Sequence, residues 1–347
     1  MAYTTINKST DYFNTKLYTG NGSLPRAITG VGHQPDFVWL KDRDTAYNHQ
    51  LYDSVRTTSA GVLYSNTNGA QDSSYQMSSF DSDGFTLGSN LGAVNENTKK
   101  IVSWNWKAGG GQGSSNTDGS INTTYTSVST TAGFSICKWT GTGANGTIGH
   151  GLGAVPTVII VKNLGTTENW VTYHKPLGAT KYLKLNDNSA EGTSSDVWNN
   201  TSPTSSVFYV GSNTATNQSG NQMIAYCFAE KTGYSKFGSY TGNGNADGSF
   251  IFCGFKPNFV MIKETSGAGA WRIFDNKRPT YNDRYGLMPD ESNAEETGDN
   301  RNKIDLLSNG FKCRFTYDDT NGNGGSYIYM AFGQSLVGSN NVPCTAR

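Results

Sequence analysis

At 347 residues the chain is longer than one ordinary globular domain, so we expect two or three domains. Its 42 glycines, 19 tyrosines and 16 phenylalanines are typical of turn-rich β structure, and no long stretch shows the apolar spacing of an amphipathic helix, which excludes a mainly helical chain. Lys plus Arg and Asp plus Glu both number 27, so no net charge draws the chain to nucleic acid or to an anionic membrane.

The N-terminal residues 1–8 contain no basic stretch followed by an apolar one, and no later run approaches about 18 apolar residues. We therefore expect neither signal-directed export nor a membrane span. The five cysteines are odd in number and widely spaced, which favours free thiols made in a reducing cytosol over a disulfide framework.

The first predicted element is a strand that ends in a glycine turn, and it occurs three times along the chain. Its copies lie at 18–22, 139–143 and 240–244. An apolar strand introduced by a proline follows each copy, at 32–41, 153–162 and 254–263. Because proline cannot donate to a β ladder, it marks the beginning of this strand. The second copy is apolar on both faces from Val158 to Val161, which predicts a central position in its sheet.

Further landmarks follow each proline in a fixed order. An aromatic residue and a polar one stand 17 and 18 residues later, at Tyr52-Asp53, Tyr173-His174 and Phe274-Asp275, and then come Phe85, Phe208 and Phe311 and closing strands at 101–106, 223–228 and 327–332. In the first closing strand Val102, Trp104 and Trp106 alternate with Ser103 and Asn105. This alternation predicts a sheet that is covered on one side.

Four landmarks repeated three times predict an all-β fold of three serial antiparallel β-sandwich repeat domains, jelly-roll-like, joined by Gly/Ser-rich linkers. The expected boundaries are repeat 1 at 1–108, a Gly/Ser/Thr-rich linker at 109–132, repeat 2 at 133–232, and repeat 3 with a C-terminal tail at 233–347. The linker composition predicts a flexible, hinged first repeat. The short connection at 230–235 predicts firm packing of the second repeat on the third.

No motif for catalysis, cofactor binding or metal binding emerges, and we expect no catalytic residue, cofactor or metal. The glycine turns lack the Gly-Lys-Ser/Thr of a phosphate loop, and 319–324 matches only the first half of a calcium loop because Met330 replaces the required Glu. Asp81–Gly84 leaves an irregular calcium site open, although a hairpin turn explains it better. The four histidines lack zinc-ligand spacing.

Carboxylate pairs for glycoside hydrolysis need only lie ~5 to 10 Å apart in space, so the sequence leaves that alternative open. We expect Asp53 with Arg56, and Asp275 with Arg278, to form exposed ion pairs of little energetic weight. Aromatic residues in loops are the candidates for ligand binding, because Tyr and Trp offer stiff stacking faces with a polar group. These candidates are Tyr47, Trp198 and Tyr281.

Several of these segments carry a family resemblance. The stretches at 9–22, 34–41, 51–56, 80–88, 198–206 and 343–347 resemble repeat-containing tail-fibre-like structural proteins of marine and cyanobacterial bacteriophages. The resemblance implies a virion location, in the tail or another external appendage, for a protein synthesised in the host cytoplasm. The chain departs from fibres in lacking a coiled-coil or intertwined shaft segment.

Taken together, we expect a non-enzymatic bacteriophage virion structural protein, a tail fibre or host-adhesion component that displays polar loops to host surface glycan or protein. The alternatives are a capsid decoration, cement or appendage scaffold protein without receptor binding, and a glycan-degrading tailspike. The expected partners are other phage virion proteins and further copies of the chain, with a trimer favoured; neither nucleic acid nor a membrane is expected.

Overall fold

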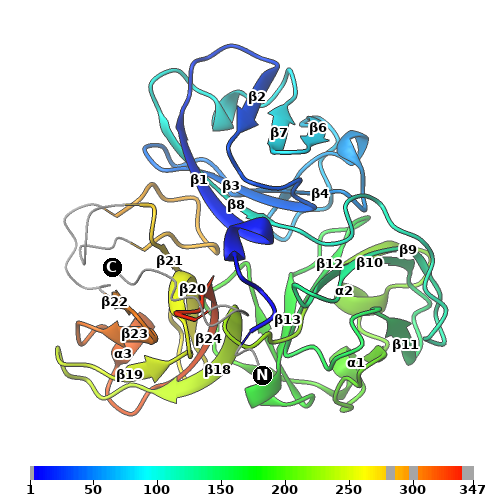
Figure 1. The fold of residues 1–347 in the computed structure, drawn as a ribbon. Coiled ribbons are helices and arrows are strands. Elements are labelled where there is room, and N and C mark those ends of the chain that lie inside the picture. The colour runs from blue at the N-terminus through cyan, green and yellow to red at the C-terminus, as the bar shows by residue number, and fades with distance from the viewer. Residues whose placement is uncertain (1–3, 279–285, 297–303, 338–347) are drawn as a thin grey trace.

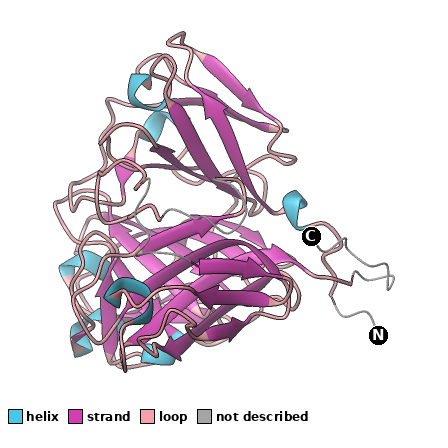
Figure 2. Cartoon of the chain, turned by 90° about the vertical axis from the view of Figure 1, so that its left-hand side faces the viewer, coloured by secondary structure: helices cyan, strands magenta, loops and turns pink. Residues whose placement is uncertain are grey.

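The structure, a computed structural model, describes residues 4–278, 286–296 and 304–337. As expected, the fold is all-β, with antiparallel sheets and only short helices at their margins (Figure 2). The short helical pieces are η1 Ser9–Asp11, η2 Thr58–Ala60, η3 Gly92–Val94, η4 Lys175–Leu177, α1 Ser195–Trp198, α2 Thr214–Asn217 and α3 Asp318–Asn321. Within the described ranges no helix is long and apolar enough to cross a membrane.

Three main sheets form the centre of three lobes (Figure 1). The first has the order β1-β8-β3-β4-β5, with β1 Phe13–Thr19, β8 Lys100–Trp106, β3 Phe37–Asp42, β4 Gln50–Asp53 and β5 Leu63–Tyr64. The second has the order β15-β14-β13-β12-β17-β10-β9, with β15 Gly192–Thr193, β14 Lys181–Lys184, β13 Val171–His174, β12 Val158–Asn163, β17 Gln222–Phe228, β10 Phe134–Thr140 and β9 Thr123–Ser129. The third has the order β18-β24-β20-β21, with β18 Ser235–Thr241, β24 Ser326–Gln334, β20 Lys256–Glu264 and β21 Arg272–Asp275.

A small sheet accompanies each main sheet. Their orders are β2-β7-β6 (β2 Arg26–Thr29, β7 Gly84–Leu87, β6 Met77–Asp81), β11-β16 (β11 Gly146–Gly149, β16 Val207–Val210) and β19-β23-β22 (β19 Phe250–Phe252, β23 Gly310–Cys313, β22 Ile304–Leu307). In each, an isoleucine pairs with one of the phenylalanine landmarks: Ile28 with Phe85, Ile148 with Phe208, and Ile251 with Phe311. These pairs are buried in three separate clusters between a small sheet and its main sheet.

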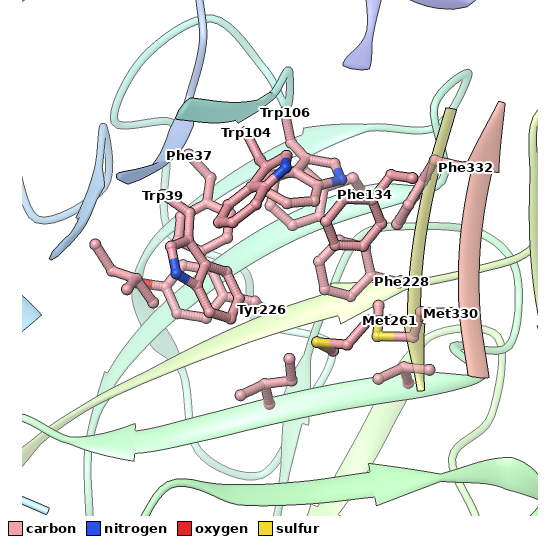
Figure 3. Packing of buried hydrophobic residues seen from close by; sticks show 14 of the residues in the cluster. Phe37, Trp39, Trp104, Trp106, Phe134, Tyr226, Phe228, Met261, Met330 and Phe332 are labelled. Atoms are coloured by element: carbon pink, nitrogen blue, oxygen red, sulfur yellow. The ribbon is translucent and has the colours of Figure 1, made fainter. Parts of the chain in front are cut away.

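The opposite face of every main sheet points to the centre of the molecule, where the three lobes meet (Figure 1). One buried cluster there combines side chains from all three lobes, including Trp104 and Trp106, Tyr226 and Phe228, and Met330 and Phe332 (Figure 3). Ring contacts link the lobes pairwise. Phe37 lies 4.4 Å from Tyr226, Phe228 lies 5.8 Å from Phe332, and Phe13 lies 5.4 Å from Phe332, measured between ring centroids.

The closing strand of the first lobe is therefore buried on both faces, and the expectation of a one-sided sheet was wrong. Val102, Trp104 and Trp106 face the shared core, while Ser103 and Asn105 are fully buried on the other face. The polar pair is tolerated because it is hydrogen-bonded: the Asn105 amide donates to the carbonyl of Asn14 and to the hydroxyl of Ser103, both at 3.0 Å.

The segment at 109–132 also differs from a flexible linker. Its second half forms β9, which pairs with β10 and extends the second main sheet. The start of the segment is held by Asp36, whose carboxylate accepts hydrogen bonds from the backbone N–H groups of Ala108, Gly110 and Gly111 at 2.7 to 2.9 Å. Together with the shared core, these bonds fix the first lobe against the second rather than leaving it hinged.

Candidate functional site

The lobes meet along three interfaces, which we call seams. The seams contain most of the polar side chains that the sequence analysis considered for catalysis or binding. The residue 14 positions after each proline crosses a seam. Trp170 and Trp271 each donate their indole N–H to a backbone carbonyl of the preceding lobe at 2.9 Å, at Tyr64 and Lys184 respectively. His49 occupies this position in the first lobe.

His49 lies in the seam between the third lobe and the first and makes no bond equivalent to those of the two tryptophans. Its Nδ1 accepts a hydrogen bond of 2.9 Å from the Trp39 indole, which places the imidazole proton on Nε2. That nitrogen is buried without a hydrogen-bond partner, although the backbone of Met288 in the third lobe acts to raise the pKa of the ring. Burial lowers the pKa of His49 well below its usual value, so the side chain is neutral and serves packing, as a partner of two tryptophan rings.

The residue 18 positions after each proline makes a second set of cyclic contacts. The hydroxyl of Tyr226 donates to Asp53 at 2.8 Å, and the Trp104 indole donates to Asp275 at 3.0 Å. His174 lies 3.2 Å from the carbonyl of Tyr329 through its Nε2. Each contact therefore joins one lobe to the closing strand of the next, and the third lobe returns to the first.

A third set of contacts comes from loops that cross to the next lobe. Each loop donates a backbone N–H to the carbonyl of the eighth residue after the next lobe's proline. The bonds run from Gln71 to Leu164 (3.0 Å), from Glu191 to Thr265 (3.0 Å) and from Glu295 to Arg43 (2.8 Å). The seams thus repeat the same bonds around a closed ring.

The ion pairs expected at the surface are buried within these seams, which corrects that prediction. Asp53 and Arg56, and likewise Asp275 and Arg278, have side chains that are at most 1% exposed. Burial acts to raise the pKa of the Asp275 carboxyl, but the charge and hydrogen bonds of Arg278 outweigh it and hold the pKa below its usual value. Glu295 joins this network by pairing with both Arg43 and Arg278.

Three lysines that end the proline-led strands are buried as well. The ammonium groups of Lys41, Lys162 and Lys263 each donate to two backbone carbonyls, and burial lowers the pKa of each to about 8. Lys162 reaches Asn68 of the first lobe and Lys263 reaches Asn188 of the second. These side chains hold loops in place and are not accessible to a ligand.

The segments considered for calcium are occupied by hydrogen bonds within the chain. Asp81 accepts from the hydroxyls of Ser79 and Thr86, and Asp83 accepts from the backbone N–H groups of Gly30 and Gly32, which lower its pKa. Within the described ranges, no group of three or more His, Cys, Asp and Glu side chains has the arrangement of a metal site.

The three aromatic residues expected to bind ligand have different surroundings. Tyr47 is 38% exposed, and the nearby Glu96 carboxylate raises the pKa of its hydroxyl. Trp198 is only 2% exposed and packs edge-on against Tyr173, so it belongs to the core of the second lobe and cannot stack on an external ligand. Tyr281 lies outside the residues that the structure describes.

Sequence reasoning missed the most exposed aromatic side chains of the described chain. Phe252 and Phe250, on the short strand β19, are 62% and 47% exposed. Both flank the buried Ile251, so they share the outer face of the third lobe's small sheet. The Phe-Ile-Phe alternation was visible in the sequence, but the repeat did not predict that the two phenylalanines would face outward.

The comparisons with known proteins give a family. Neither the curated proteins nor the solved structures contain a match to the chain. A family model described as "Domain of unknown function (DUF7483)" matches residues 8–335, which include all three lobes. The chain therefore belongs to the DUF7483 family.

Proposed function

We propose that this chain is a non-enzymatic bacteriophage virion protein, a tail-fibre or host-adhesion component built from three sandwich repeats in series. The proposal places it in the tail or another external appendage, in contact with other virion proteins. It displays its outward loops and small sheets to a glycan or protein of the host surface.

The observation that carries this proposal is that the reactive side chains in the seams form bonds between lobes. Asp53, Asp275 and His174 are buried and bound to neighbouring lobes, so they hold three units as one rigid body. What remains exposed is a polar surface on a chain without net charge, with a few aromatic side chains. A rigid body with such a surface suits display and recognition better than turnover.

The ring of three lobes changes what the expected homotrimer means. A trimeric fibre brings three equal units together around an axis, and this chain brings three equivalent sheets around one shared core by itself. We propose that such a chain caps or joins a threefold virion structure, either as one copy or as a trimer of copies.

Adsorption of the purified chain to host cells tests the proposal. We expect saturable binding to cells of the phage's host and none to cells that resist the phage. Absence of binding, together with labelled protein that follows the capsid lattice in images of virions, would favour a decoration protein instead. Release of reducing ends from host polysaccharide would favour the tailspike alternative.

A further inference from the structure

Strand β19 of the third lobe carries an apolar face that its counterparts lack. The residues on either side of the buried isoleucine are Phe250 and Phe252 in the third lobe. The first lobe has Ala27 and Thr29 at these positions, and the second has Thr147 and Gly149. Because the three small sheets share one pairing pattern, the fold does not require phenylalanine here.

The surroundings leave both rings open on one side. Phe252 pairs across the sheet with Gly310, which has no side chain to cover the ring. Phe250 pairs with Lys312, whose ammonium group forms an ion pair with Asp247 at 2.5 Å. Side chains at i and i+2 of a strand lie on the same face about 7 Å apart, so one ligand can reach both rings.

A pocket of about 380 Å³ adjoins this surface, and Phe252 forms one of its walls. The pocket is lined also by Glu230, Lys236 and the hydroxyl-bearing Thr232 and Ser235. Glu230 and Lys236 form an ion pair at 3.3 Å and both are partly exposed. The backbone N–H of Phe237 binds the other oxygen of the Glu230 carboxylate at 2.8 Å, so the carboxylate is fixed in direction.

The size and charge of the site select the class of ligand. The two phenylalanines expose roughly 200 Å² of ring surface, given about 150 to 250 Å² for an aromatic side chain, whereas a stable protein interface needs about 800 Å² on each partner. The Lys236–Glu230 pair is neutral as a unit, so it supplies hydrogen-bond donors and acceptors without attracting a charged ligand. A stacking surface beside such a pocket fits a small, uncharged, hydroxyl-rich ring.

We infer that the outer face of the third lobe binds a neutral sugar, which stacks one ring face on Phe252 and Phe250 and directs hydroxyl groups to Glu230 and Lys236. The inference rests on the proposed role in host recognition and names the ligand class and the lobe that contacts it. The first and second lobes, with small or polar side chains in place of the phenylalanines, serve as scaffold at this position.

Saturation-transfer NMR with methyl glycosides of glucose, galactose, mannose and N-acetylglucosamine tests the inference on the whole chain. We expect transfer to the ring protons of at least one sugar, with about fivefold weaker binding in Phe252→Ala, since loss of one stacking contact removes about 1 kcal/mol. The control is Tyr75→Ala, which removes an exposed aromatic side chain of the first lobe and should leave sugar binding unchanged. Thermal melting of both variants confirms that they fold.

Three results would overturn the inference. No transfer to any of the four sugars would do so, as would equal binding by wild type and Phe252→Ala. Concentration-dependent dimerisation that Phe252→Ala abolishes would assign the face to a second copy of the chain instead. Host-cell adsorption separates this question from the proposed function: adsorption by wild type together with any of these three results leaves the adhesion role intact and removes the sugar site from this face.

Discussion

Asp53 illustrates how a single buried carboxylate connects two lobes. It forms an ion pair with Arg56 within the first lobe and accepts a hydrogen bond from Tyr226 of the second. Neither group of the ion pair is reached by solvent, so removing one charge leaves the other without its counter-ion.

We predict that Asp53→Asn lowers the free energy of unfolding by about 3 to 5 kcal/mol, because the Arg56 guanidinium stays buried and loses its ionic partner. Tyr226→Phe, which removes only the hydrogen bond between lobes, should lower it by about 1 kcal/mol. Urea denaturation measures both. The matched control is Asp11→Asn in the exposed Lys8–Asp11 pair, for which we expect no measurable change. Equal effects of Asp53→Asn and the control would contradict the buried ion pair.

Asp290 makes the stability of the molecule depend on pH. Its Oδ1 accepts the backbone N–H of Trp271, as Asn66 and Asn186 do for His49 and Trp170. The two asparagines also bond to Asn48 and Asn169, but the third lobe has Ala270 there, and Oδ2 of Asp290 is buried without a partner. Burial raises the pKa of Asp290 to about 7, with Glu291 adding to the effect and Lys263 and Arg272 opposing it.

A carboxyl whose pKa is raised in the folded state holds its proton more tightly there than in the unfolded chain. Its contribution to stability is fully present below pH ~4 and is lost as the pH rises through about 7. We predict that Asp290→Asn melts at a higher temperature than wild type at pH 8.5, and that the difference shrinks at pH 5. Thermal melts at the two pH values measure it. A difference that is the same at both would show that Asp290 is not titrating in this range.

At the scale of single elements, the opening glycine turns are fixed by one asparagine in each lobe. The side-chain oxygens of Asn95, Asn217 and Asn321 accept the backbone N–H of the residue after the turn glycine, at 3.1 to 3.3 Å. The glycines pack so closely on the following segment that a Cβ on Gly20 would lie 1.9 Å from the carbonyl oxygen of Glu96. The same approach occurs at Gly141 and Gly242.

We predict that Gly20→Ala displaces the opening turn and strongly destabilises the chain, because a backbone carbonyl cannot yield as a flexible side chain would. Gly92→Ala is the control, since a Cβ there would meet nothing within 4 Å. Circular-dichroism melts distinguish the two variants. An unchanged melting temperature in Gly20→Ala would contradict the close approach.

The connection between the first two lobes depends on Asp36. Since this carboxylate holds three backbone N–H groups of 108–111 and the hydroxyl of Ser54, Asp36→Ala should release the glycine segment while leaving both lobes folded. We predict faster cleavage within 108–113 by a nonspecific protease, followed by mass spectrometry of the fragments. Equal cleavage rates in wild type and variant would mean that the segment is held by other contacts.

The sequence predicted the elements better than their surroundings. Prolines, glycine turns and closing aromatics are local signals, so the β strands they mark appear where expected. The surroundings of the closing strand were predicted wrongly because Ser103 and Asn105 look solvent-facing. Both are buried, and the Asn105 amide is hydrogen-bonded to another segment. Trp198 was misread for the opposite reason: its polar neighbours suggested a loop, whereas a short helix turns the ring inward.

At the scale of the whole molecule, local sequence patterns could not predict the core that the three lobes share. The double-sided apolarity of Val158 to Val161 was a signal of it, because one face packs within the second lobe and the other faces its neighbours. Nothing in a single chain segment says which distant segment covers a second apolar face. The ring bonds depend likewise on pairs more than 70 residues apart, such as Trp271 with Lys184.

A closed ring of seams should make the three lobes unfold as one body, and scanning calorimetry of the intact chain tests this most directly. If the seams couple the lobes, one transition should appear, with a van't Hoff enthalpy equal to a calorimetric enthalpy on the order of 240 kcal/mol for 347 residues. Separate transitions, or a van't Hoff enthalpy near one third of the calorimetric value, would show that the lobes unfold independently and would contradict the closed ring.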